Sequence, residues 1–149
     1  MIRIAGNIVA PSVIGSIEFA ASQFGSRLVV VMGHTRCGAI AATVKAIETG
    51  MEAASRNIRD ITDRIAPHVE PLVRSGPPEG VLRAAVRANV RASVDHLRHG
   101  SRILEEQVMA GRLAVIGAEY ELETGVVDFF DGPESPRSPV IPRADQSGR

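Results

Sequence analysis

The feature that most constrains the fold is a continuous apolar run that leads directly into a glycine-bounded turn. The run is Leu28-Val29-Val30-Val31-Met32, and the turn is Gly33-His34-Thr35-Arg36-Cys37-Gly38. A mostly β-branched run of this length predicts a strand buried on both faces, as in a parallel sheet. A helix is expected from about Ala39 to Thr49, with Gly50 as its stop signal. This part of the chain is therefore predicted as strand, turn and helix.

Three other stretches have helical periodicity. The first runs from Val13 to Phe24, and Gly25 suits the left-handed position that follows a helix. The second covers residues 54–73 and is expected to be broken into pieces by Pro67 and Pro71. The third is a long helix that begins at Glu79, with a kink expected at Gly100. Its apolar stripe is interpreted as core or dimer interface and consists of Val86, Val90, Val94 and Leu97.

The remaining apolar segments are short and read as strands. Leu113–Ala118 is predicted to be a second buried strand, and Val126–Phe130 an antiparallel return strand. Ile2–Ile4 alternates over too few residues for more than a short strand. Strands separated by helices indicate an α/β fold with a mostly parallel sheet covered by helices. In such sheets ligands bind at the carboxyl ends of strands, which is where residues 33–38 fall.

Length and composition limit the class of protein. With 149 residues the chain is one domain, expected over residues 1–131, and the proline- and serine-rich residues 132–149 are expected to be disordered. Its 17 basic and 17 acidic residues cancel, so no overall field favours nucleic acid or a membrane surface. Four arginines on the long helix are therefore interpreted as a solvated face: Arg83, Arg87, Arg91 and Arg98. A cytoplasmic protein without a membrane span is expected.

His34 and Cys37 are the candidate metal ligands. Imidazole nitrogen and thiolate sulfur both bind zinc, and a short turn can direct both at one ion. Cys37 also precedes a predicted helix, whose free backbone N–H groups favour a thiolate. Two ligands do not complete a zinc site, however, and a lone cysteine is most often a small buried apolar residue. A nucleophilic or redox role of the Cys37 thiol is a further alternative.

The order of motifs resembles the β-class carbonic anhydrases. That family has an Arg-x-Ala-Gly-Asn segment, a Gly-Ser-Leu/Ile-Glu-Tyr/Phe helix and a Gly-His-Ser/Thr-x-Cys-Gly-Ala turn, in this order. The matching segments of this chain are Arg3–Asn7, Gly15–Phe19 and Gly33–Ala39. The likeness continues through Val115–Tyr120 and reaches about Phe130.

The resemblance implies a zinc-dependent reversible hydration of carbon dioxide to bicarbonate. In the family two cysteines and one histidine hold one zinc ion per subunit, and the fourth position takes water or hydroxide. His34 and Cys37 match two of these ligands. The resemblance places Arg3 near the site cleft and gives Gly6, Asn7 and Gly38 a role in shaping it. A homodimer or larger homo-oligomer is also implied.

The chain departs from the family in one respect. The family's other zinc cysteine lies in a Cys-x-Asp-Ser-Arg motif, which is found nowhere here, and Cys37 is the only cysteine. The assisting Asp and Arg of that motif are absent with it, so no catalytic residue is identified. The remaining histidines are interpreted as surface or capping residues: His68, His96 and His99. The alternative function is therefore an N-terminally truncated, inactive paralogue that serves as a binding or oligomerisation module.

Overall fold

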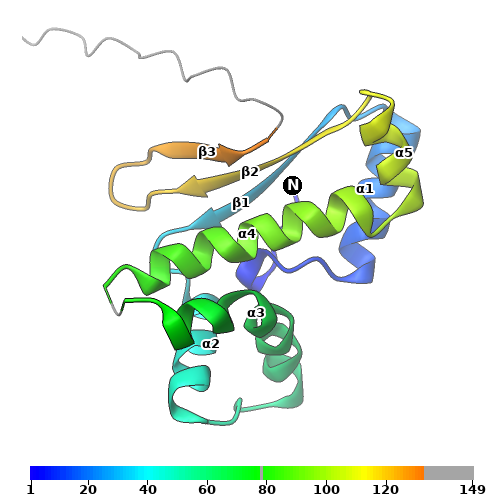
Figure 1. Ribbon diagram of the computed structural model, residues 1–149. Coiled ribbons are helices and arrows are strands. Elements are labelled where there is room, and N and C mark those ends of the chain that lie inside the picture. The colour runs from blue at the N-terminus through cyan, green and yellow to red at the C-terminus, as the bar shows by residue number, and fades with distance from the viewer. Residues whose placement is uncertain (78, 133–149) are drawn as a thin grey trace, which may run out of the picture.

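The computed structural model describes residues 1–77 and 79–132 (Figure 1). A 3₁₀ turn at Ala5–Asn7 (η1) precedes the first helix. The helices are α1 (Pro11–Phe24), α2 (Gly38–Thr49), α3 (Arg56–Ser75), α4 (Val81–His99) and α5 (Arg102–Met109). The strands are β1 (Leu28–His34), β2 (Ala114–Tyr120) and β3 (Val127–Asp131).

The described strands form one sheet in the order β1-β2-β3. β1 and β2 are parallel, with Gly33 opposite Glu119 and His34 opposite Tyr120. β3 returns antiparallel to β2. The predicted α/β fold with an antiparallel C-terminal strand is confirmed, and the predicted strand, turn and helix at residues 28–49 form as expected.

One face of the sheet is covered by α4, which runs along the strands (Figure 1). Its predicted apolar stripe is core, because Val86, Val90, Val94 and Leu97 are all buried. Two glycines of the strands allow this close approach. A Cβ atom on Gly33 would lie 2.7 Å from a methyl group of Val90, and one on Gly117 would lie 3.0 Å from the other. Helix and sheet are therefore in direct contact at the centre of the core.

The opposite face of the sheet is not covered by any described helix (Figure 1). Since side chains alternate along a strand, Val31 and Gly33 face α4 while Leu28, Val30 and Met32 face away. These three are 56%, 38% and 44% exposed. The prediction that this strand is buried on both faces is therefore wrong. A run of β-branched residues shows that the segment suits a strand. Whether both faces of that strand are buried depends on the neighbouring elements.

Helix α3 runs unbroken through Pro67 and Pro71, contrary to the expected interruption. Both prolines lie on the exposed side of the helix. On the other side, Ile65 and Val69 are completely buried against α2 and α4. The missing backbone hydrogen bonds thus fall where water can replace them, and the buried apolar face keeps the helix continuous.

Two smaller expectations also change. Ile2–Ile4 forms no strand, and Ile2 and Ile4 are exposed before the 3₁₀ turn. At Gly100 the chain does not kink within one helix but ends α4, and the side chain of Ser101 caps α5 by accepting from the Leu104 N–H.

Among the described residues no helix is both long and apolar enough to cross a membrane. The expected disorder of residues 132–149 concerns positions that, apart from Gly132, lie outside the described residues.

Candidate functional site

The candidate site is the turn between the carboxyl end of β1 and the first residue of α2. His34 is the last residue of β1, and Cys37 occupies the N-cap position of α2. Between them Arg36 adopts a left-handed backbone conformation, with φ of 57°. The reversal brings the histidine and the cysteine to the same end of the sheet, where parallel sheets present their ligand sites.

The His34 ring is oriented by a hydrogen bond of the turn itself. Its Nδ1 donates to the Thr35 carbonyl oxygen at 2.9 Å, because a carbonyl oxygen can only accept. This contact leaves the lone pair of Nε2 available. A histidine held through one nitrogen, with the other free, has the arrangement that metal-binding histidines use.

Cys37 is buried, with 7% of its surface exposed, among Ile8, Ile40 and Ile65. Its backbone carbonyl accepts the Ala41 N–H and so begins the hydrogen-bond ladder of α2. The burial fits the interpretation of a small apolar residue, and the helix N-terminus fits that of a thiolate ligand.

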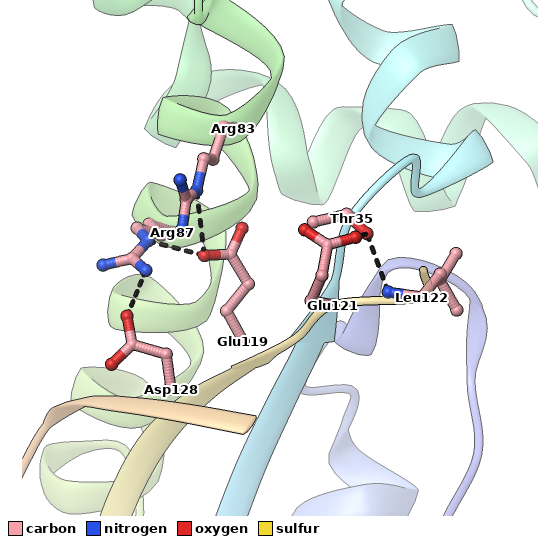
Figure 2. A network of polar contacts seen from close by, with 7 residues as sticks. All are labelled: Thr35, Arg83, Arg87, Glu119, Glu121, Leu122 and Asp128. Carbon is pink, nitrogen blue, oxygen red and sulfur yellow. Dashed lines mark hydrogen bonds and ion pairs between the residues drawn. The ribbon is translucent and has the colours of Figure 1, made fainter. Parts of the chain in front are cut away.

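The turn is fastened to the hairpin between β2 and β3 (Figure 2). The Thr35 N–H donates to the Tyr120 carbonyl, and the Thr35 hydroxyl donates to Glu121 Oε1 at 2.9 Å. The same hydroxyl oxygen accepts the Leu122 N–H at 3.1 Å. Arg36 adds an exposed ion pair with Glu123 at 3.1 Å.

These contacts also affect the titration of Glu121. The hydrogen bond from Thr35, with a second from the Glu123 N–H, holds the pKa of the Glu121 carboxyl below its ordinary value. Nearby Arg36 and Arg83 act in the same direction.

Gly6 and Asn7 lie beside the turn and connect it to α4. Gly6 has a φ of 66°, and its carbonyl accepts the Asn89 side chain at 2.7 Å. Asn7 and Ser93 are joined twice, since the Ser93 hydroxyl donates to the Asn7 carbonyl and accepts from the Asn7 amide. A Cβ atom on Gly6 would lie 2.7 Å from Ile65, so this position needs glycine for both space and conformation.

Arg3 and Gly38 have less definite surroundings. Arg3 is exposed and makes no hydrogen bond or ion pair with other described residues. Gly38 is the first residue of α2, and a Cβ atom there would meet nothing within 4 Å. Neither position is fixed by packing in this structure.

The donor atoms match zinc in kind but not in number. His34 and Cys37 offer the nitrogen and sulfur that zinc prefers, whereas catalytic zinc sites use three protein ligands. No group of three or more His, Cys, Asp or Glu residues that could hold a metal occurs in the described part of the chain. The described residues by themselves therefore supply part of a zinc site and not a whole one.

Sequence reasoning missed a second polar cluster, which joins α4 to β2 and β3. Glu119 of β2 is 2% exposed and accepts from Arg87 at 2.7 Å and from Arg83 at 3.3 Å (Figure 2). Arg87 also pairs with Asp128 of β3 and lies over the Phe130 ring, as does Arg91. The arginines read as a solvated face thus join α4 to the sheet. The available signal was a glutamate that directly follows the buried run Leu113–Ala118.

The opposing influences on Arg87 have a net direction. Burial lowers the pKa of its guanidinium, but hydrogen bonds and charges of Asp128 and Glu119 outweigh that effect, so the pKa is raised. Arg87 therefore remains a cation inside the cluster.

Comparison with known proteins identifies related sequences. A family model described as carbonic anhydrase matches residues 1–127. Carbonic anhydrase 2 of Mycobacterium tuberculosis is 33% identical over 127 residues, which is 84% of this chain and 59% of that protein. The carbonic anhydrase of Mycolicibacterium smegmatis is 33% identical over 131 residues, 87% of this chain and 61% of that protein. The chain thus spans about three fifths of the length of these relatives.

Solved structures share the fold. A Coccomyxa β-carbonic anhydrase in complex with acetazolamide superposes with a TM-score of 0.71 at 23% identity, over 87% of this chain and 59% of that one. A tetrameric β-carbonic anhydrase of Sordaria macrospora gives a TM-score of 0.69 at 19% identity, over 87% and 66%. At these identities the likeness establishes the arrangement of elements alone.

Proposed function

The chain belongs to the β-class carbonic anhydrase family, and from this premise we propose that it takes part in the reversible hydration of carbon dioxide to bicarbonate. The observation that carries the proposal is the placement of His34 at the carboxyl end of β1 and of Cys37 at the N-cap of α2, within one short turn. His34 would offer Nε2 to a zinc ion, since Nδ1 is bound to the Thr35 carbonyl. Cys37 would offer a thiolate at the N-terminus of α2.

The remaining site residues are assigned to the support of this turn. Asn7 and Gly6 would hold the floor of the site against α4, and Thr35 would fix the turn to the hairpin. Arg3 and Gly38 would border the cleft, Arg3 as an exposed cation available to bicarbonate. When bound, zinc lowers the pKa of water toward about 7 and so supplies hydroxide for addition to carbon dioxide.

The proposal requires a third zinc ligand besides the His34 and Cys37 of one chain, and a second copy of the chain is one source. We propose a homo-oligomer for this reason. The uncovered face of β1 supports it, because a patch of Leu28, Val30 and Met32 is the kind of surface that another subunit covers.

The decisive experiment is the zinc content per chain, measured by elemental analysis of the protein purified without added metal. We expect about one zinc per chain, lost in His34→Ala and in Cys37→Ala. His68→Ala serves as the matched control, since His68 is exposed on α3 and should not affect zinc content. A folded protein with almost no zinc would contradict the proposal, whereas a loaded one would next be assayed for carbon dioxide hydration.

A second candidate function is a non-catalytic module that binds other subunits. The turn supplies only two metal ligands, and no group of three occurs among the described residues, which favours this function. The uncovered face of the sheet favours it as well. Val30→Lys would place a charge in the centre of that face. If the face is an interface, this variant should shift sedimentation toward the monomer without loss of folding. Ala42→Lys, an exposed change on α2 that adds the same single charge, is the control.

A further inference from the structure

We propose that a pocket between α4 and the β2–β3 hairpin binds a small primary ammonium compound. The pocket has a volume of about 230 Å³ and is lined by Arg83, Glu119, Glu121, Thr124, Val126 and Asp128. The inference does not depend on zinc at the His34–Cys37 turn, because none of these residues belongs to that pair.

The first argument is an unsatisfied buried oxygen. Glu119 is 2% exposed, and its Oε2 accepts from both Arg83 and Arg87. Its Oε1 is buried and has no hydrogen-bond donor among the described residues. A buried carboxylate oxygen without a donor is costly, and a bound group with N–H donors would remove that cost.

The second argument is the balance of charge. The pocket is lined by three carboxylates, those of Glu119, Glu121 and Asp128, and by one guanidinium group, that of Arg83. Arg87 pairs with Glu119 and Asp128 from outside the lining, and even when it is counted the carboxylates exceed the guanidinium groups by one. Arg87 is shared between two carboxylates. Arg83 is 65% exposed and makes the longer contact with Glu119, so it can yield its place to another cation.

The third argument concerns the shape of the donor. Glu119 lies in β2, and Glu121 is the first residue after that strand. Figure 2 shows their side chains projecting toward the same space beside α4. Glu119 Oε1 requires an N–H or O–H donor, and the surplus charge favours a cation. No metal-binding group of three occurs among the described residues. A primary ammonium has three donors on one compact centre, which fits two carboxylates at once.

The fourth argument is size. A volume of about 230 Å³ lies below the roughly 300–1,000 Å³ of common ligand pockets, so the ligand is small. Val126 supplies an apolar wall that can contact a short alkyl chain. A short free aliphatic amine fits these limits better than a lysine side chain, which would bring a bulky polypeptide to the opening.

The test is a titration of the full ¹⁵N-labelled chain with methylammonium chloride, followed by NMR at constant ionic strength. We expect saturable shifts of the backbone amides of residues 119–126. Tetramethylammonium and potassium, which are cations without N–H donors, should give no saturable shifts at these positions. Equal responses to methylammonium and tetramethylammonium would overturn the proposal, as would the absence of saturation.

Variants locate the site. Glu119→Gln should weaken methylammonium binding by about tenfold or more, since the charged acceptor is lost. Glu123→Gln is the matched control, because Glu123 lies on the same hairpin, is 70% exposed and does not line the pocket. It should bind methylammonium as the unaltered chain does. Binding unaffected by Glu119→Gln would overturn the assignment.

A second variant covers the case in which Glu119→Gln does not fold. Val126 is 59% exposed, so Val126→Lys can place a tethered ammonium in the pocket without disturbing the core. Methylammonium binding should then disappear, and persistence of that binding would overturn the proposal. Nα-acetyl-lysine amide provides the last comparison. If it binds more tightly than butylammonium, the natural occupant is a lysine side chain and the free-amine proposal is wrong.

Discussion

The two faces of the sheet differ sharply although the same strands build both. On the α4 face, Val31 and Val115 are buried and Glu119 is held by arginines of α4. On the opposite face, Leu28, Val30 and Met32 of β1 and Phe129 of β3 are between 38% and 56% exposed. The difference teaches that an apolar side chain contributes to stability only where a neighbouring element removes it from water.

The polar contacts follow the same division. The hairpin is joined to α4 by ion pairs of Arg87 and to the candidate site by the hydroxyl of Thr35. The uncovered face has no comparable cluster among the described residues. One side of the sheet is therefore a completed interior, and the other is an exposed apolar surface.

The largest expected contrast is in the free energy of unfolding, between a leucine of α4 that is buried and a leucine on the uncovered face of β1. Leu97→Ala, at a position 1% exposed, should lower the free energy of unfolding by about 2–5 kcal/mol. Leu28→Ala, at a position 56% exposed, should change it by no more than about 0.5 kcal/mol. Urea denaturation of both variants checks the pair. Similar losses for both would mean that the outer face is covered in solution.

A smaller effect is expected from filling the space between β1 and α4. Gly33→Ala should destabilise the protein by about 1–3 kcal/mol, because the new methyl group meets Val90 at 2.7 Å and Val86 at 3.0 Å. Gly15→Ala in α1 is the control with opposite sign. Nothing lies within 4 Å of a Cβ atom there, so better helix propensity should stabilise by about 0.5–1 kcal/mol. Thermal unfolding of the two variants distinguishes these outcomes.

The hydrogen bonds between the turn and the hairpin should contribute about 1 kcal/mol to the free energy of unfolding. Thr35→Val removes the hydroxyl that joins Glu121 and the Leu122 N–H, and the loosened turn should expose Cys37. The rate of Cys37 alkylation by iodoacetamide is therefore expected to rise. Thr62→Val, where the hydroxyl bonds only within its own helix, should leave that rate unchanged. An unchanged rate in Thr35→Val would show that the hairpin does not hold the turn.

The smallest effect concerns pH. Since the pKa of Glu121 is lowered in the folded state, its stabilising contribution is present above about 4.3, the ordinary pKa of a glutamate, and is lost as pH falls through the folded value. The difference in unfolding free energy between the unaltered chain and Glu121→Gln should therefore shrink on acidification below about pH 4.3. Denaturation curves from pH 7 to pH 3 measure it. A difference that grows toward low pH would contradict the assignment.

The sequence alone predicted the parts of the molecule that depend on local pattern. The run 28–32, the glycines that follow α1 and α2 and the stripe on α4 each fix an element through its own side chains and backbone preferences. The sequence also placed His34 and Cys37 in one turn, because only Thr35 and Arg36 separate them, but their assignment as zinc ligands came from the family resemblance and stays a prediction.

Only the tertiary structure decided the features that depend on what lies beside each element. It left one face of β1 uncovered, kept α3 continuous through two prolines and brought Glu119 of β2 to Arg83 and Arg87 of α4. Burial and ion pairing between segments 32 or more residues apart are properties of packing. No local periodicity records them, since the free energy of a side chain depends on its neighbours in space and not on those in sequence.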